Sequence, residues 1–263
     1  MEITSIGSSS SGNSYLIKAG SVNLLLDLGL SASKILQAAS ELGIDAEDID
    51  AVLITHEHID HVRSIRAISK KCTNAKFYAS RGTIENCSAF CDVDEDRICV
   101  VRAGDTLEFG EVKVGCFSLS HDASEPIGYS FICDGEKVCV VTDTGVVTDE
   151  IFDEIKTADA LIFEANHEEN LLMMGEYPYY VKMRIKSDQG HLSNVTAGEV
   201  LGRILDERES DSELSIMLAH LSEKNNTPYQ ARLTIEDILR DRGYERDVHY
   251  SLHIAAKEGL TTL

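Results

Sequence analysis

Short apolar runs of strand length recur along the chain, and amphipathic stretches lie between many of them. A continuous apolar run bounded by turn residues is typical of a buried strand, whereas apolar residues three and four positions apart are typical of one face of a helix. The alternation of the two predicts an α/β fold. The predicted strands are 1–6, 15–18, 22–26, 51–54, 76–79, 98–101, 106–109, 112–118, 127–133, 137–141, 160–163, 214–219 and 248–252. The predicted helices are a first one ending at 42, then 62–70, 81–90, 194–207 and 228–243.

The stretch 51–61 is the most informative part of this pattern. Its apolar strand ends at Ile54, and the predicted loop that leaves the strand is dense in polar side chains. Imidazole nitrogens and carboxylate oxygens are the ligands that a borderline-soft divalent metal prefers. The candidate metal ligands of this stretch are His56, His58, Asp60 and His61.

The spacing of these four residues favours two ions over one. His56 and His58 alternate along the chain, so in extended backbone their side chains point the same way. Asp60 and His61 lie beyond a bend and reach a second point in space. The stretch therefore predicts two adjacent metal sites at the end of one strand.

Other predicted strands also end at residues that carry chemistry. They are Asp27, His121, Asp143, Glu164 and His220. Because the carboxyl ends of parallel strands meet at one edge of a sheet, the recurrence of these residues at strand ends predicts that their side chains converge on one site. An unpaired buried carboxylate is costly, so Asp27 is expected to cap a turn or to hold a ligand histidine in one tautomer.

A segment rich in Ser and Gly, residues 7–13, joins the first two strands. These are turn residues, so one interpretation is a hairpin loop with no further role. In the alternative interpretation, the hydroxyls and amides of the segment, including Ser11 and Asn13, donate to a bound anion. The sequence leaves both interpretations open.

Residues 175–186 form a basic and aromatic segment in an acidic chain. Lys182 and Arg184 either lie on a solvated helix face or contact phosphates, with neighbouring tyrosines available for stacking on bases. The segment leads directly to His191, which favours the functional interpretation.

The composition limits the classes of function. A formal net charge of −21 argues against a broad nucleic-acid-binding face. Two bound dications would nevertheless make the local field positive. The length of 263 residues fits one domain, 1–263. No signal peptide or membrane-spanning run is visible. The seven cysteines are odd in number, which suggests free thiols in a reducing cytoplasm.

The residues at the strand ends resemble those of the metallo-β-lactamase superfamily. The core of the resemblance is the His-x-His-x-Asp-His motif at residues 56–61, and it extends to Asp27, His121, Asp143 and His220. The resemblance implies a four-layer αββα sandwich of two mixed β-sheets, with helices outside and a dinuclear metal site at one sheet edge.

Further segments resemble the YycJ/WalJ branch of this superfamily, whose members look like phosphodiesterases associated with 5′-exonuclease action on DNA. These segments are 10–13, 164–167, 177–186, 190–194, 220–222 and 225–228. In related tRNA 3′-processing ribonucleases the corresponding Glu and His form a proton-relay pair, which implies Glu164 and His191 here. The candidate substrate-binding residues are Ser11, Asn13, Lys182, Arg184, Asn225 and Asn226.

The resemblance also implies the role of each metal ligand. His56, His58 and His121 would hold one ion, Asp60, His61 and His220 the other, and Asp143 would bridge them. Zinc suits this set, with manganese as a substitute. The implied nucleophile is a metal-bridged hydroxide that Asp60 orients or deprotonates, and the implied general acid is His191, oriented by Glu164.

Two other functions remain open. The same ligands would activate water against a small or cyclic phosphodiester, a thioester or a lactone. A non-catalytic regulatory protein on this fold would be expected to lose ligands, whereas this chain keeps the set. The short segment between Asp143 and His191 has no room for the large inserted domain of RNase J-type nucleases, which favours DNA over structured RNA. The oligomeric state stays open.

Overall fold

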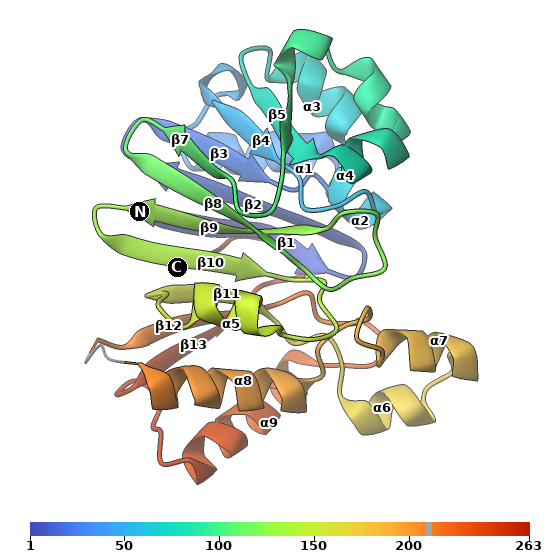
Figure 1. The fold of residues 1–263 in the computed structure, drawn as a ribbon, viewed down its shortest axis with the longest axis vertical. Helices are drawn as coiled ribbons and strands as arrows, with labels where there is room; N and C mark the ends of the chain where they lie inside the picture. Colours follow the sequence, from blue (N-terminus) through green and yellow to red (C-terminus); the bar gives the residue numbers. More distant parts are fainter. Residues whose placement is uncertain (209–211) are drawn as a thin grey trace. The chain divides into compact units, whose positions relative to one another are not determined.

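The computed structural model describes residues 1–208 and 212–263, in which the chain divides into two compact units (Figure 1). Unit 1 comprises Met1–Ser118, Ala123–Gly135 and Ala256–Leu263. Unit 2 comprises Leu119–Asp122 and Glu136–Ala255. The prediction of a single domain stays a prediction.

Unit 1 contains a complete mixed sheet in the order β14-β1-β2-β3-β4-β5-β6. Strands β14 to β3 of this order pair antiparallel, and strands β3 to β6 pair parallel. Strand β4 is fully buried and β3 nearly so, which explains their continuous apolar sequences. The strands are β1 (Glu2–Ser9), β2 (Gly12–Ala19), β3 (Val22–Leu26), β4 (Ala51–Leu53), β5 (Lys76–Ser80), β6 (Ile98–Val101) and β14 (Thr261–Thr262).

Helices of unit 1 share a hydrophobic core with this sheet. Ile35 of α1 and Ile65 and Ile68 of α3 are fully buried in one cluster with Leu25 and Val52 of the strands. The helices are α1 (Ala32–Glu41), α2 (Ile59–Val62), α3 (Ile65–Lys71) and α4 (Arg81–Asn86), with 3₁₀ turns η1 (Ala46–Asp48), η2 (Ser88–Asp92) and η3 (Glu95–Arg97). The predicted helix 81–90 is therefore an α-helix followed by a 3₁₀ turn, because the backbone is extended at Cys87.

Unit 1 also contains a second group of strands. Unit 1 contributes the antiparallel strands β7 (Thr106–Phe109), β8 (Val112–Ser118) and β9 (Ile127–Cys133). Strand β9 supports the end of β4, because the Tyr129 hydroxyl donates to the carbonyl of Ile54 at 2.9 Å.

The segment 7–13 is a tight hairpin. Strand β1 continues to Ser9 and β2 begins at Gly12, so only Ser10 and Ser11 lie in the turn. The register shifts between Ser5 and Gly7, which marks a bulge in β1. Of the two interpretations of this segment, the structure shows the hairpin; whether its exposed turn also contacts an anion is untested.

The helix predicted at 62–70 is interrupted, which corrects the sequence-based interpretation. Helix α2 ends at Val62 and α3 begins at Ile65. The loop after β3 takes over backbone groups at the break: the N–H of Leu28 donates to the carbonyl of His61 at 2.7 Å, and the N–H of Ser64 donates to the carbonyl of Leu28 at 3.0 Å. These bonds replace helical ones and tie the polar loop to the end of β3.

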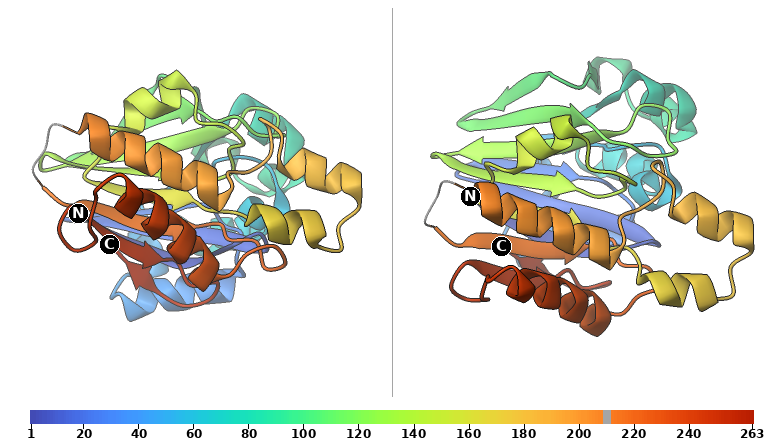
Figure 2. Two further views of the ribbon diagram at one scale, coloured as in Figure 1. Left: turned by 90° about the horizontal axis from the view of Figure 1, so that it is seen from below. Right: turned by 60° about the horizontal axis from the view of Figure 1, so that its bottom comes forward.

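Unit 2 is built on four parallel strands with helices packed against them. Figure 2 shows that α8 and α9 run side by side, while α6 and α7 lie beyond the end at which α8 begins. The strands are β10 (Glu136–Val141), β11 (Ala160–Glu164), β12 (Leu214–Ala219) and β13 (Tyr250–Ile254). The helices are α5 (Asp149–Ile155), α6 (Glu169–Met174), α7 (Tyr179–Ile185), α8 (Asn194–Glu207) and α9 (Pro228–Asp241).

Most predicted elements are confirmed within a few residues. Helix α8 has the predicted bounds, and α9 begins with proline in its first turn as predicted. The last long strand is two residues further along than the prediction, at Tyr250–Ile254. The α/β class and the two mixed sheets are as predicted. In the part of the chain that the structure describes, no helix has the length and apolar character needed to cross a bilayer.

Candidate active site

Parallel pairing brings two polar strand ends of unit 1 together. Leu26 of β3 lies in register with Leu53 of β4, and the N–H of Asp27 donates to the carbonyl of Leu53 at 2.9 Å. Asp27 is therefore level with the start of the loop that carries His56 and His61. All three side chains are fully buried.

A single carboxylate, Asp27, orders two histidines of this loop. The Nδ1 of His61 donates to Asp27 Oδ2 at 2.7 Å. Thr55 connects the second histidine, because its hydroxyl donates to Asp27 Oδ2 at 2.9 Å and lies 3.0 Å from Nδ1 of His56. Both imidazoles then keep the lone pair on Nε2, the form that binds a metal. These are the contacts that the predicted role of Asp27 requires.

The other two candidate ligands of the loop lie beside these histidines. The ring of His56 is 4.6 Å from that of His58 and 4.2 Å from that of His61, measured between centroids. The Oδ2 of Asp60 lies 3.4 Å from Nε2 of His61. The loop is held from the side by Glu57, whose Oε1 accepts from the N–H of Ser124 at 2.7 Å. Unit 1 thus gathers three imidazoles and a carboxylate.

Unit 2 gathers a second set at the ends of its parallel strands. Register pairs Val141 of β10 with Phe163 of β11, and Glu164 of β11 with Ala219 of β12. The strands therefore deliver Asp143, Glu164 and His220 to one edge, as the sequence predicted. One ligand atom each of Asp143, Glu164, His191 and His220 lies within 4.8 Å of the others.

Glu164 is the centre of this second set and is fully buried. Its Oε1 accepts from Nδ1 of His191 and from Nδ1 of His220, each at 2.8 Å. Its Oε2 accepts from the backbone N–H of Leu192 at 3.1 Å and of Thr144 at 3.2 Å. Burial alone would raise the pKa of this carboxyl, but His191 and His220 outweigh burial and lower its pKa to about 2.

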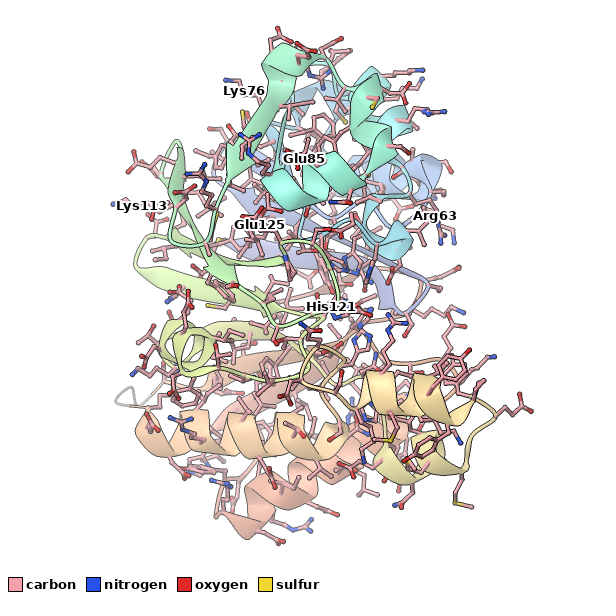
Figure 3. All side chains as sticks on the ribbon, turned by 45° about the vertical axis from the view of Figure 1, so that its right-hand side comes forward. Arg63, Lys76, Glu85, Lys113, His121 and Glu125 are labelled. Carbon is pink, nitrogen blue, oxygen red and sulfur yellow. The ribbon has the colours of Figure 1, made fainter. Side chains whose placement is uncertain are left out.

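The remaining groups face Asp143. Its Oδ1 lies 3.3 Å from Nε2 of His220, and 3.8 Å from both Nε2 of His121 and Nδ1 of His191. His121, labelled in Figure 3, lies with its Nδ1 3.1 Å from the carbonyl oxygen of Gly190. Burial lowers the pKa of His121 although Asp143 acts in the opposite direction, which favours the neutral form of the ring that a metal binds.

Three of these strand-end residues have strained backbone. Asp27, Asp143 and His220 have φ values of 59°, 59° and 55°, in the left-handed region. This conformation costs an L-residue roughly 1–2 kcal/mol.

We expect the strain at Asp143 to be visible in the stability of the metal-free protein. Asp143→Gly should be more stable than Asp143→Ala by about 1 kcal/mol, because glycine adopts positive φ without cost. Both variants remove the same carboxylate, so the comparison isolates the backbone. Urea unfolding in chelator measures the difference, and equal stabilities would contradict the strain.

The candidate substrate residues of unit 1 differ in exposure. Ser11 is exposed in the turn of the hairpin. Asn13 is fully buried, and its side-chain Oδ1 accepts from the Ser8 hydroxyl at 2.8 Å while Nδ2 lies 3.2 Å from Nε2 of His61. The amide of Asn13 thus fixes the hairpin against a candidate ligand.

In unit 2, the two candidate phosphate-binding cations already have protein partners. The Nζ of Lys182 donates to the carbonyls of Met173 at 2.8 Å and Gly175 at 2.7 Å, and its side chain is buried. Arg184 forms an ion pair with Asp122, the neighbour of His121. Lys182 thus caps the end of α6, and Arg184 connects α7 to the His121 segment.

We therefore expect Lys182→Ala to destabilise the protein by about 2 kcal/mol, because two hydrogen bonds from a buried ammonium are lost. Lys186→Ala is the matched control, since the ammonium of the exposed Lys186 pairs with the carboxylate of Glu169 at 3.3 Å, and such a surface pair contributes ~0–1 kcal/mol. Denaturant unfolding compares them. A Lys182 variant as stable as the control would overturn this assignment.

The two candidate asparagines, Asn225 and Asn226, are also buried. The Nδ2 of Asn226 donates to the carbonyl of Ala165 and to the side chain of Asn194, both at 2.8 Å. The carbonyl of Asn225 accepts from the N–H of Glu168 at 2.9 Å. Asn226 thus ties the start of α9 to the end of β11 and the start of α8, and Asn225 binds the N-cap residue of α6.

Two contributing residues were missed by the sequence interpretation. Thr55 relays the hydrogen bond between Asp27 and His56, and Asp122 lies with Oδ1 3.3 Å from Nε2 of His121. Both are immediate neighbours of predicted ligands, and a polar residue beside a ligand histidine was the available signal.

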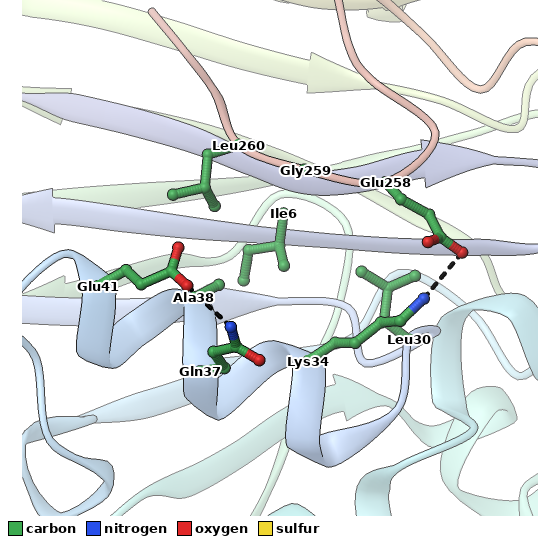
Figure 4. Close-up of a pocket in the computed structure, with 9 residues that line it drawn as sticks. All are labelled: Ile6, Leu30, Lys34, Gln37, Ala38, Glu41, Glu258, Gly259 and Leu260. Atoms are coloured by element: carbon green, nitrogen blue, oxygen red, sulfur yellow. Dashed lines mark hydrogen bonds and ion pairs between the residues drawn. The ribbon is translucent and has the colours of Figure 1, made fainter.

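A hollow of about 240 Å³ lies elsewhere in unit 1, between α1 and the C-terminal segment (Figure 4). Its charged rim pairs Lys34 with Glu258 at 2.8 Å and Gln37 with Glu41 at 2.9 Å. None of the predicted site residues lines it, and its lining contains no histidine or cysteine.

Comparison with known proteins agrees with this geometry. Residues 22–209 match the family description of the β-lactamase superfamily domain. The chain belongs to this family of metal-dependent hydrolases. The predicted metallo-β-lactamase fold is confirmed, since the crystal structure of the metallo-β-lactamase fold protein YhfI from Bacillus subtilis aligns with a TM-score of 0.72 at 17% identity, over 100% of this chain and 99% of that one.

Two named relatives match nearly the whole chain. Exodeoxyribonuclease WalJ of Streptococcus pneumoniae is 34% identical over 98% of this chain and 95% of its own length. Exodeoxyribonuclease YycJ of Bacillus anthracis is 34% identical over 94% of this chain and 92% of its own length. The resemblance to the YycJ/WalJ branch is thus confirmed.

Proposed function

We propose that the protein is a dinuclear-metal-dependent exodeoxyribonuclease of the YycJ/WalJ type. The observation that carries the proposal is the Glu164–His191 pair, in which a buried carboxylate orients an imidazole beside Asp143. A general acid of this kind protonates a poor leaving group such as the alkoxide of a phosphodiester, whereas the thiolate of a thioester departs without a proton. The relatives' names supply the substrate class.

The proposed metal ligands are the histidines and carboxylates that the sequence predicted. His56, His58 and His121 would bind one divalent ion, Asp60, His61 and His220 the other, and Asp143 would bridge them. The donor set fits such ions, because the bonds of Nδ1 in His61 and His220 to carboxylates leave Nε2 as the ligand atom. Zinc suits this set, with manganese as an alternative. Bound ions would supply Lewis acidity and lower the pKa of water.

The protein's own residues would supply the proton transfers. His191 would hold a proton at Nε2 for the leaving oxygen, since its Nδ1 is committed to Glu164. The ring is mostly buried but keeps 17% of its side-chain surface exposed, which leaves it accessible to substrate. Asp60, with 18% exposed, would orient and deprotonate the attacking water.

The remaining candidate residues would shape the substrate site. Ser11 would contact the substrate directly from its exposed turn, whereas Asn13, Asn225 and Asn226 would act by fixing the backbone around the ligands. DNA is the proposed substrate and the cytoplasm the proposed location. Seven free thiols in the chain support a reducing compartment.

The test pairs metal analysis of the purified protein with digestion of end-labelled single- and double-stranded DNA and RNA. We expect about two equivalents of divalent metal and release of nucleotides from DNA, and a chelator should abolish the release. His58→Ala should lower the metal content, with His249→Ala as the matched control far along the sequence. Hydrolysis of a thioester or a β-lactam in preference to DNA and bis-p-nitrophenyl phosphate would favour a small-molecule hydrolase. A metal-loaded protein inert to all of them would favour a regulatory role.

A further inference from the structure

Glu57 lies between two proposed metal ligands, His56 and His58, and its side chain contacts a distant segment of unit 1. Its Oε1 accepts from the N–H and from the hydroxyl of Ser124, both at 2.7 Å. Hydrogen bonds to a carboxylate are stronger than those between neutral groups. The other oxygen, Oε2, is buried and has no hydrogen-bond partner among the described residues. A substitution that removes Oε1 therefore removes the whole hydrogen-bonded contact.

This contact is one of three that follow one another between two stretches of unit 1, 54–57 and 124–129. The donors on the second stretch are Tyr129, Ile127 and Ser124, and their acceptors on the first are Ile54, Thr55 and Glu57, respectively. The first two contacts hold the chain before His56. The contact at Glu57 holds the chain after His56, where it approaches His58.

The segment that Glu57 contacts is fixed independently from another direction. The Oε2 of Glu125, which is labelled in Figure 3, accepts from the N–H of Gly82 in α4 at 2.8 Å. The two segments approach closely here, because a Cβ at Gly82 would lie only 2.7 Å from Cβ of Glu125. Ser124 is therefore a firm point against which the side chain of Glu57 can hold its own loop.

The position of His58 depends on this loop more than that of His56 does. His56 is fully buried, and Thr55 connects its ring to Asp27. Glu57 and His58 are only half-buried, so packing constrains them less. His58 is the N-cap residue of α2, with extended φ and ψ of −63° and 145°, so the backbone changes direction directly after it. An anchor at Glu57 fixes the backbone on the side of this bend that carries no helix.

We propose that Glu57 is a positioning residue: its bonds to Ser124 fix the backbone at His58, so that the imidazole of His58 is placed in advance for the ion assigned to His56, His58 and His121. This inference rests on the dinuclear metal centre of the proposed function and adds a determinant of how tightly one of the two ions is held. Outer partners that orient a metal ligand typically contribute roughly 10–100-fold to metal affinity.

The test measures how tightly the full chain retains metal. Protein loaded with Co²⁺ is titrated with a chelator of known affinity, and visible absorption reports the ions that stay bound. We expect Glu57→Ala to release one ion at roughly 10–100-fold lower free chelator than the wild type and to hold the other ion normally. Glu57→Gln should behave like the wild type, because it keeps an acceptor at Oε1. An alanine variant that holds both ions as tightly as the wild type would overturn the inference.

A matched control separates positioning from simple anchoring of the segment 124–129. Glu125→Ala breaks the bond to Gly82 and keeps the contact between Glu57 and Ser124. It should lower the stability of the metal-free protein, measured by urea unfolding in chelator, yet hold both ions like the wild type. If Glu125→Ala loses one ion as readily as Glu57→Ala does, Glu57 merely anchors the segment and the inference fails. Equal loosening of both ions in Glu57→Ala would indicate a general loss of structure and would also overturn it.

Metal retention requires no turnover, so this inference and the nuclease proposal fail separately. If the wild type degrades DNA and Glu57→Ala holds both ions normally, the positioning role fails and the nuclease stands. If Glu57→Ala loosens one ion but the wild type releases no nucleotides from DNA, the positioning role stands and the nuclease fails. A wild-type protein that binds no divalent ion would overturn both.

Discussion

Replacing His191 by alanine is expected to lower kcat on DNA by ~10²–10⁴-fold, the usual contribution of a general acid. The activated ester bis-p-nitrophenyl phosphate should suffer far less, because p-nitrophenolate departs without a proton. The expectation follows from the geometry at Glu164, which accepts from Nδ1 of His191 and leaves Nε2 to carry the proton. The measurement is kcat for both substrates at matched metal content.

The outcome separates an acid from a structural residue. His191 is not among the proposed metal ligands, so metal content should stay near that of the wild type. Equal losses on both substrates would contradict the acid role and make His191 a positioning residue. His249→Ala serves as the control, since His249 is exposed and its imidazole accepts from the N–H of Glu245 in the adjacent turn.

Replacing Glu164 by alanine should have the largest effect on stability. In the metal-free protein we expect a loss of about 3–5 kcal/mol, the usual result of removing one partner of a buried charged pair. Two imidazoles and two backbone N–H groups lose their acceptor at once. Denaturant unfolding measures the loss. Glu169→Ala, which removes a half-buried carboxylate paired, among the described residues, only with Lys186 at the surface, should cost no more than about 1 kcal/mol.

The stability contributed by Glu164 should also depend on pH. Its pKa falls from the ordinary value of 4.5 to about 2 in the folded protein, so the folded state binds fewer protons than the unfolded state. The contribution is therefore complete above about pH 4.5 and is lost as pH falls toward 2. Glu164→Gln should lack this dependence. A glutamine variant with the wild-type slope between these values would contradict the assignment.

Much of the candidate site could be predicted from the sequence alone, because its candidate ligands lie at strand ends. Every position of β4 is apolar and buried. The end of this apolar run therefore predicts where the strand stops and where the polar loop with His56 begins. The same reasoning identified Asp143, Glu164 and His220 as residues of one edge, and parallel register brings them together. Hydrogen bonding between paired strands fixes the positions of residues that follow a strand end closely in the sequence.

Other features of the structure depend on hydrogen-bond partners that no local sequence pattern predicts. Lys182 belongs to a basic segment, yet its ammonium donates to the carbonyl of Met173 in α6 and to that of Gly175, the C-cap of α6. Helix 62–70 has the right apolar periodicity, yet the loop after β3 captures the backbone groups of His61 and Ser64 and breaks it. At the helix break, hydrogen bonds to Leu28, which is distant in the sequence, outweigh a local helix preference of a few tenths of a kcal/mol per residue.

The sequence by itself determined the α/β class, the strand ends that carry histidines and carboxylates, and the family to which the motif at 56–61 belongs. Only the tertiary structure decided that Glu164 serves His191 and His220 together, and that Asp27 serves His61 directly and His56 through Thr55. The physical reason is that strand periodicity fixes which residues reach an edge, whereas hydrogen bonds between side chains distant in sequence depend on how the strands and loops pack.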